Sequence, residues 1–333
     1  MKTIFNFVIM LLVILGLGIT FSKYHQSSDL KKQADLLMEQ GKTQEAIIMY
    51  EQARGVFPWR QDVVNDLEGA QLVLQSDLDY GQIYQIGAET QILPPLSILP
   101  SINKLQPNEI FVPILMYHHI RVNPRPGSPV WASLNLTPDQ LNSQLQYLTS
   151  HGYQTISLDE LYLALTKNTP LPSLPIVLTF DDGYRTFYDS VFPLLKKYKV
   201  KAVEFVITQV EGAPAYLTWD QIMEIDASGL VQWGAHTRHH PNLPDLSTAA
   251  ITNEIKGSKA DLELHLKKPI TWFAYPYGSY NNFIVQTVQD SGFVGAVSTI
   301  YGAAQSKDKL YLAPRIMVDG RFSLAEFITR IQK

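Results

Sequence analysis

Eight short apolar runs recur between residues 110 and 318, and helix signals separate most of them. Each run has the length and composition of a buried strand. Alternation of strands and helices predicts a parallel α/β domain, and so many strands favour a closed, irregular (β/α) barrel over an open sheet. The runs are Phe111–Tyr117, Tyr153–Ile156, Ile176–Phe180, Ala202–Ile207, Val231–Ala235, Thr271–Tyr275, Val294–Val297 and Pro314–Val318.

Capping residues mark the starts of several helices between these runs. Thr137-Pro138 begins one helix, whose buried face carries leucines at 141, 145 and 148. No Gly-rich phosphate loop opens any of the helices, which removes the main reason to expect a nucleotide-binding sheet. Three further starts match a capping box: Ser157/Glu160, Thr218/Gln221 and Ser323/Glu326.

The N-terminus carries an uninterrupted apolar stretch, Ile4–Phe21, after Met1-Lys2-Thr3. It is at the lower limit of length for a spanning helix and longer than the usual core of a signal peptide. Because Thr20-Phe21-Ser22 only weakly matches a cleavage site, we expect residues 1–22 to be an uncleaved membrane anchor; a removed signal peptide and a secreted protein are the alternative. In both cases the body of the protein is expected outside the cytoplasm, at the cell membrane if anchored.

Residues 23–80 have the pattern of a short α-helical hairpin. One repeat of the tetratricopeptide type cannot bury its own faces, so we expect a stalk or a hairpin packed on the main domain. A module that binds a protein partner is the alternative. Prolines then predict an extended linker over residues 81–108, which leaves 109–333 as the main domain. The residues at repeat spacing are Ala34, Gly41, Ala46, Tyr50, Ala53 and Pro58.

The bulk composition excludes several classes of function. With 46% hydrophobic and 17% charged residues, the chain has the material for a substantial core. The net charge is −4 and the basic residues are dispersed, which argues against a nucleic-acid surface. The absence of cysteine excludes disulfides, thiolate metal sites and a cysteine nucleophile.

Polar clusters follow the predicted strands at their C-terminal ends. Asp181-Asp182-Gly183 follows one apolar run; taken alone, the two carboxylates could equally be a helix cap and a solvated side chain. The other clusters make a shared site the better interpretation, because the C-terminal ends of parallel barrel strands lie on one face. These clusters are His118-His119, the three histidines 236, 239 and 240, and Tyr275-Pro276-Tyr277-Gly278.

The spacing of the histidines indicates a metal site. His236 and His240 are four residues apart, so both imidazoles can reach one ion. With one carboxylate they form a two-histidine, one-carboxylate set that leaves positions open for water and substrate. A second aspartate is then free to act as a general base, and a separate histidine can protonate a leaving group. His239 is expected in an outer shell or in solvent.

These motifs resemble the polysaccharide deacetylases of carbohydrate esterase family four, the NodB-homology domain. The resemblance covers residues from about 110 to 333 and rests on Thr179-Phe180-Asp181-Asp182-Gly183-Tyr184 and on His236-Thr-x-x-His240-Pro241. It implies that Asp181 is the catalytic base and that Asp182, His236 and His240 bind a divalent metal, with zinc the expected ion. It also implies that the backbone amide of Tyr184 stabilises the oxyanion.

Two features depart from the family pattern. Ala274 stands where the family has an arginine that orients the base, and Arg315 on the last strand is the candidate to replace it. The C-terminal Leu-x-His that carries the general acid is absent. The run Met116-Tyr117-His118-His119 is instead similar to the circularly permuted branch that includes poly-N-acetylglucosamine deacetylases, which assigns the acid to His118 and leaves His119 as a packed neighbour.

The resemblance implies a hydrolase that removes N-acetyl groups from an extracytoplasmic amino-sugar polymer, such as poly-N-acetylglucosamine, peptidoglycan or a chitin-like chain. Among the candidate aromatics Trp219, Tyr275 and Tyr277, Tyr277 is preferred as a platform for the sugar. Two alternatives stay open. One is a catalytically silent glycan-binding scaffold, which Ala274 favours, and the other is a hydrolase of a different C–N amide bond.

Overall fold

The computed structural model describes residues 22–38, 40, 42–56, 63, 105–123, 129–210 and 213–332. The chain divides into two compact units, one of residues 1–77 with 213–215 and one of residues 78–212 with 216–333. The predicted anchor and most of the predicted linker lie outside the described residues, so the boundaries at 22, 80 and 108 stay predictions. Within the described ranges, no helix is long and apolar enough to cross a membrane.

The first unit contains the predicted helical hairpin. Residues 22–38 are helical, and α2 (Thr43–Val56) follows after a short connection. Side-chain hydrogen bonds join the helices: the Ser27 hydroxyl donates to the carbonyl oxygen of Ala53 (2.9 Å), and the Tyr50 hydroxyl donates to Asp35 (2.6 Å). Ala34 is fully buried, as small residues at a close helix contact should be.

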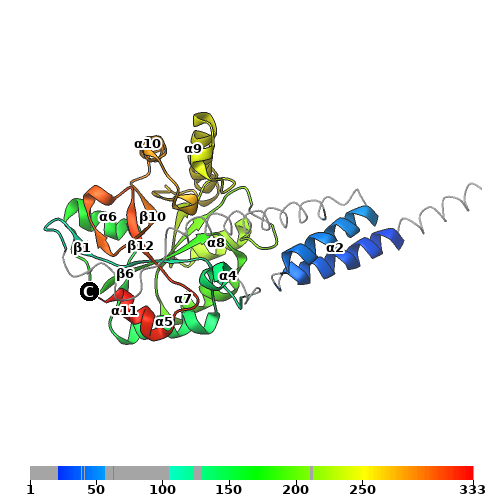
Figure 1. The fold of residues 1–333 in the computed structure, drawn as a ribbon, viewed down its shortest axis with the longest axis horizontal. Coiled ribbons are helices and arrows are strands. Elements are labelled where there is room, and N and C mark those ends of the chain that lie inside the picture. Colours follow the sequence, from blue (N-terminus) through cyan, green and yellow to red (C-terminus); the bar gives the residue numbers. More distant parts are fainter. Residues whose placement is uncertain are drawn as a thin grey trace, which may run out of the picture. The chain divides into compact units, whose positions relative to one another are not determined.

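The second unit is built on a closed ring of seven parallel strands (Figure 1). The ring runs β2-β12-β10-β9-β8-β7-β6 and closes where β2 pairs with β6. The first and last ring strands in the sequence, β2 and β12, are therefore neighbours. The ring strands are β2 (Ile114–Tyr117), β6 (Pro175–Asp182), β7 (Ala202–Val206), β8 (Val231–Ala235), β9 (Trp272–Ala274), β10 (Gly295–Tyr301) and β12 (Ala313–Met317).

The prediction of a parallel barrel is confirmed, but the expected eighth strand is not part of the ring. β5 (Gln154–Thr155) pairs only with the first two residues of β6, below the point where β2 closes the ring. The remaining short strands lie in small separate pairs, β1 with β11 and β3 with β4. They are β1 (Ile110–Phe111), β3 (His119–Ile120), β4 (Asn135–Leu136) and β11 (Ala304–Gln305).

Helices follow most ring strands and cover the outside of the barrel. Figure 1 shows α5, α7 and α11 grouped on one side. All four predicted helix starts are confirmed, with capping boxes at Thr137, Ser157, Thr218 and Ser323. The helices are α4 (Pro129–Leu134), α5 (Pro138–Ser150), α6 (Leu158–Lys167), α7 (Phe192–Tyr198), α8 (Trp219–Ala227), α9 (Thr248–Leu266), α10 (Asn282–Asp290) and α11 (Leu324–Ile331).

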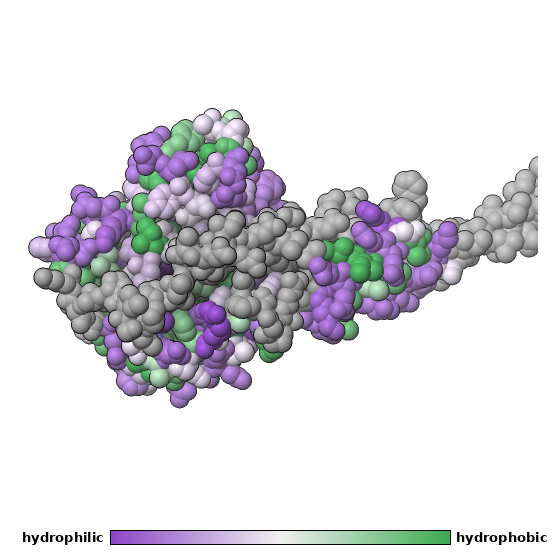
Figure 2. All heavy atoms as spheres, in the orientation of Figure 1, coloured by the Kyte–Doolittle hydropathy of each residue, from purple (hydrophilic) through white to green (hydrophobic). Residues whose placement is uncertain are grey.

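The core has two layers that alternate along each strand. In β7, Val203 and Phe205 belong to the cluster that fills the barrel, whereas Ala202 and Val206 belong to the cluster between the barrel and the helices. This alternation follows from the two-residue period of a strand. Among the coloured residues on the face shown in Figure 2, hydrophilic side chains predominate and apolar side chains lie in small groups.

The close packing inside the barrel at Gly234 is testable. A Cβ atom there would lie 2.4 Å from the Phe205 ring and 3.2 Å from the carbonyl oxygen of Trp272. Gly234→Ala should therefore lower the free energy of unfolding by about 1–3 kcal/mol through overpacking, measured by urea denaturation. In a double-mutant cycle, Phe205→Leu should make the alanine less costly. Additive effects would contradict a direct clash.

Candidate active site

The predicted functional residues gather on one face of the barrel. Asp182 is the last residue of β6, and His236 directly follows β8. His118 follows β2, and Tyr277 lies just after β9. Because all seven ring strands are parallel, these C-terminal ends share one face, which is where barrel enzymes carry their active sites.

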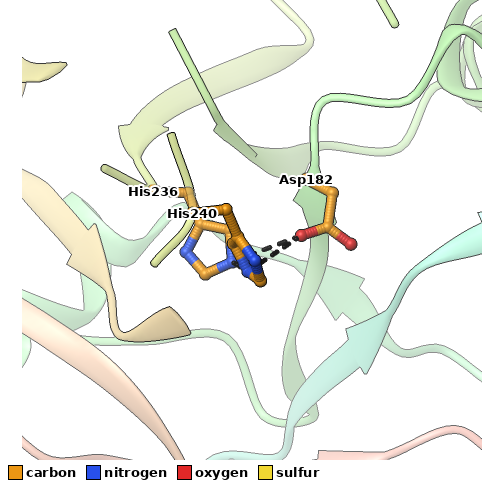
Figure 3. Close-up of side chains that lie close together, drawn as sticks. All are labelled: Asp182, His236 and His240. Atoms are coloured by element: carbon orange, nitrogen blue, oxygen red, sulfur yellow. Dashed lines mark hydrogen bonds and ion pairs between the residues drawn. The ribbon is translucent and has the colours of Figure 1, made fainter. Parts of the chain in front are cut away.

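Asp182, His236 and His240 form a buried cluster of potential metal ligands (Figure 3). The Nε2 atoms of the two histidines lie 3.1 Å apart, and each is 3.4 Å from Oδ1 of Asp182. Figure 3 shows the three side chains pointing toward one another. The sequence prediction that these residues come together is confirmed.

The geometry of the cluster fits a divalent ion. Donor atoms about 2.0–2.2 Å from a tetrahedral ion are separated by about 3.3–3.6 Å, close to the distances in this cluster. Neither oxygen of the buried Asp182 carboxylate receives a hydrogen bond from the described residues. A buried carboxylate in that condition is costly unless a cation neutralises it. The donor set is therefore a candidate metal centre.

Backbone contacts orient the two histidines. Nδ1 of His236 lies 2.8 Å from the carbonyl oxygen of Ala274, which can only accept, so Nδ1 carries the proton and Nε2 offers its lone pair. The backbone N–H of His240 donates to the Thr237 hydroxyl (2.9 Å). Thr237 and His240 both have positive φ angles, 67° and 57°. Such strained backbone is typical of functional sites.

Two members of the cluster, Asp182 and His240, have protonation states that suit metal binding, whereas burial of His236 is outweighed by its contact with Asp182 and the charge of Asp181, which raise its pKa. Burial, together with the neighbouring His236, lowers the pKa of His240 to about 3, so this imidazole is neutral at ordinary pH. Burial by itself raises the pKa of Asp182, but the two histidines outweigh it and hold that pKa well below its usual range. A neutral imidazole and an ionised carboxylate are the forms that bind a cation.

The catalytic-base candidate, Asp181, is held by Arg315. Two parallel hydrogen bonds of 2.8 Å join the guanidinium to both carboxylate oxygens, and the two side chains are only 1% and 3% exposed. The same guanidinium donates to the Thr179 hydroxyl and to the carbonyl oxygen of Ser298. Arg315 thus fills the place left by Ala274, as proposed from the sequence.

This ion pair keeps Asp181 ionised. Burial tends to raise the pKa of Asp181, but the adjacent Arg315 guanidinium outweighs it, so the pKa lies below its ordinary value. A bidentate Arg–carboxylate pair also fixes the direction of the carboxylate. Asp181 is therefore an oriented, deprotonated group beside the ligand cluster.

The two adjacent histidines of the first strand lie in different surroundings. Burial lowers the pKa of His118, while the charges of Asp182 and Asp181 oppose that shift, which puts His118 within the field of the site. His119 instead stacks on the Tyr184 ring with centroids 3.7 Å apart and is 5% exposed. His119 is the packed neighbour that the sequence predicted.

The aromatic candidates separate in the same way. The Tyr277 ring contacts the His240 ring with centroids 4.5 Å apart, and its hydroxyl donates to the His240 carbonyl oxygen (3.3 Å). Tyr275 is 1% exposed and donates to the carbonyl oxygen of Tyr311, so it belongs to the core and is not a sugar platform. Trp219 stacks on His265 at 3.8 Å.

The sequence did not predict the side chains that support the loop of residues 236–240. Glu254 accepts hydrogen bonds from the backbone N–H groups of Arg238 and His239 and binds Nδ1 of His239 (2.7 Å), which places His239 outside the ligand cluster. Arg238 forms a double hydrogen bond with Asp261 on α9. These partners are far apart in the sequence and follow no motif. Only the fold reveals them.

Comparison with known sequences agrees with this site. Residues 168–296 match the family model described as polysaccharide deacetylase. YxkH of Bacillus subtilis, a protein assigned to the polysaccharide deacetylases, is 30% identical over 216 residues, which span 65% of this chain and 74% of the relative. The poly-beta-1,6-N-acetyl-D-glucosamine N-deacetylase of Staphylococcus aureus is 28% identical over 197 residues, 55% of this chain and 68% of the relative.

Solved structures show the same fold. The Streptococcus pyogenes deacetylase PplD, in complex with acetate, is 33% identical with a TM-score of 0.62, covering 68% of this chain and all of that one. IcaB from Ammonifex degensii is 25% identical with a TM-score of 0.59, covering 67% and 97%. Fold and site together define a parallel-barrel hydrolase with a candidate metal centre. The chain belongs to the polysaccharide deacetylase family.

The Arg315–Asp181 pair gives a prediction with a definite sign. Arg315→Met leaves a buried carboxylate without its partner, which should cost about 3–5 kcal/mol of stability. It should also raise the pKa of Asp181. Because a general base works deprotonated, the acid limb of the kcat/KM profile for acetate release should move to higher pH.

The control for this variant is Arg330→Met, which removes a buried arginine on α11. It should lower the melting temperature without moving the acid limb. An unchanged acid limb in Arg315→Met would show that the guanidinium does not set the pKa of the base.

Proposed function

We propose that this protein hydrolyses the N-acetyl groups of an extracytoplasmic amino-sugar polymer with the help of a divalent ion, zinc being the expected one. The observation that carries the proposal is the pairing of a ligand cluster with a second, separately held carboxylate. Asp182 faces His236 and His240, whereas Asp181 faces Arg315. This division leaves one aspartate available as a metal ligand and the other as a general base, two roles that metal-assisted hydrolysis uses.

The residues of the chain then take distinct roles. Asp182, His236 and His240 would hold the ion, which when bound polarises the amide carbonyl and acidifies water. Asp181 accepts the proton of the water molecule that attacks the carbonyl carbon. Its low pKa keeps it ready to do so, and Arg315 keeps its oxygens in a fixed direction.

Assistance to the leaving group comes from the end of β2, and assistance to the oxyanion comes from the turn after β6. His118 donates a proton to the amide nitrogen as the C–N bond breaks, which gives a free amine and acetate. The backbone N–H of Tyr184 donates to the oxyanion. Tyr277, whose ring packs on His240, forms the wall against which the apolar face of the sugar ring rests.

A polymer outside the cytoplasm is the proposed substrate for two reasons. The relatives in Staphylococcus aureus are named for a polymer of N-acetylglucosamine. The apolar stretch Ile4–Phe21 is the proposed membrane anchor, which would hold the barrel outside the cell membrane. A protein partner for the hairpin remains a weaker proposal.

The base assignment is tested with Asp181→Asn. Acetate release from poly-N-acetylglucosamine, peptidoglycan and chitin oligomers should fall by about 10²–10⁴-fold, since the amide cannot take the proton. Bound metal, measured by elemental analysis, should stay at the wild-type level because Asp182 is untouched. Retained activity would reject Asp181 as the base. A wild-type protein that binds metal but releases acetate from none of the three polymers would reject the substrate class.

The acid assignment is tested with His118→Gln. Turnover should fall by about 10²–10⁴-fold while metal content stays unchanged, because glutamine cannot donate a proton to the leaving amine. His151→Gln, which alters an exposed histidine at the end of α5, serves as the control and should keep full turnover. Parallel loss of metal and activity in His118→Gln would show that His118 is a ligand.

A further inference from the structure

Glu204 is a buried carboxyl group that the proposed mechanism does not use. It lies in the middle of β7, is 1% exposed, and is surrounded along the strand by apolar residues. Its register partner on β6 is Phe180, two residues before Asp182. Its Oε2 atom has no hydrogen-bond partner among the described residues. Burial of such a group is costly, so its presence in this strand calls for a reason.

Within the part of the chain that the structure describes, the hydrogen bond of this carboxyl group goes to the turn after β6. Oε1 of Glu204 accepts from the backbone N–H of Gly183 (2.9 Å). The carbonyl oxygen of Gly183 accepts from the N–H of Leu217 (2.9 Å). An antiparallel bridge between Tyr184 and Tyr216 follows immediately. The turn is thus held by backbone contacts to residues 216 and 217 and by one side chain, that of Glu204; we call this set of contacts the anchor of the turn.

The turn needs such an anchor because its backbone is unfavourable. Asp182 and Gly183 have consecutive positive φ angles, 83° and 75°. Glycine adopts this region freely, but an aspartate there is strained. This turn changes the direction of the chain at Asp182 itself. Asp182 therefore faces His236 and His240, while Tyr184 begins the next segment.

We propose that Glu204 is a positioning residue: by holding the Gly183 N–H it fixes the Asp182–Gly183 turn and so aims the Asp182 carboxylate at the two histidines. The inference rests on the proposed function in taking Asp182 as a metal ligand. A role confined to general stability is the competing explanation, and the experiment below separates the two.

The acceptor oxygen of Glu204 is the part of the residue that the turn requires. Burial raises the pKa of Glu204 well above the ordinary value, and the carboxylates of Asp181 and Asp182 raise it further. The hydrogen bond from Gly183 needs only an acceptor oxygen at the position of Oε1. Glutamine has the same shape and offers a carbonyl oxygen at that position, so it should replace Glu204.

The experiment compares Glu204→Leu and Glu204→Gln in the full chain. Zinc affinity is measured by competition with a chromogenic chelator, and acetate release is followed at saturating zinc. Glu204→Leu should lose about tenfold or more in zinc affinity, as expected for the loss of an outer-shell support, and Glu204→Gln should stay near the wild type. Gln305→Leu, which removes a buried amide bound to the carbonyls of Val112 and Pro314, is the control. It should lower the melting temperature and leave zinc affinity unchanged.

Hydrogen exchange of the peptide containing Gly183, measured on metal-free protein, gives an independent reading. Exchange should be faster in Glu204→Leu than in the wild type and in Glu204→Gln. Wild-type exchange and zinc affinity in Glu204→Leu would overturn the proposal, as would a Glu204→Gln variant as defective as the leucine variant. A wild-type protein that binds no zinc would reject the proposed function instead. The exchange experiment would then still test whether Glu204 holds the N–H of Gly183.

Discussion

The buried ion pair between Asp181 and Arg315 is the interaction on which the site depends. It joins β6 to β12, two strands that are not neighbours because β2 lies between them. Because β2 lies between the two strands, the pair depends on closure of the ring, and so does the geometry around Asp181. Both charges are nearly inaccessible to water, and removing one partner would leave the other uncompensated.

The same closure gives two adjacent aspartates opposite surroundings. Asp181 points into the barrel, where a guanidinium neutralises it, and Asp182 turns through a positive φ angle toward two imidazoles. Neighbouring carboxylates with distinct partners can perform distinct tasks, one as a base and one as a ligand. The left-handed backbone of Asp182 is the local feature that separates them.

Much of this arrangement was predictable because it depends on local patterns. Buried strands, capping boxes and the four-residue spacing of His236 and His240 follow from periodicity and chemistry, and the structure bears them out. The strand count was too high because the run Tyr153–Ile156 has the pattern of a barrel strand, whereas the strand it forms, β5, has two residues and pairs with only two residues of β6. Tyr275 could not be assigned to the core from its motif alone. Glu204 had a visible signal, a single carboxyl group in an apolar strand, but its partner Gly183 is known only from the register of β6 and β7.

Arg315 and His118 occupy other positions along the chain than the family motifs give, and they show why order along the chain is a poor guide to activity in this fold. Each ring strand ends on the same face, so a side chain at the end of one strand can reach the centre as well as a side chain from another. Arg315 on β12 binds Asp181, the proposed base, in place of an arginine at position 274, and His118 directly follows β2, the strand next to β12. A missing motif residue at Ala274 was the main argument for a catalytically silent scaffold. That argument loses its basis because the guanidinium of Arg315 reaches Asp181 from β12.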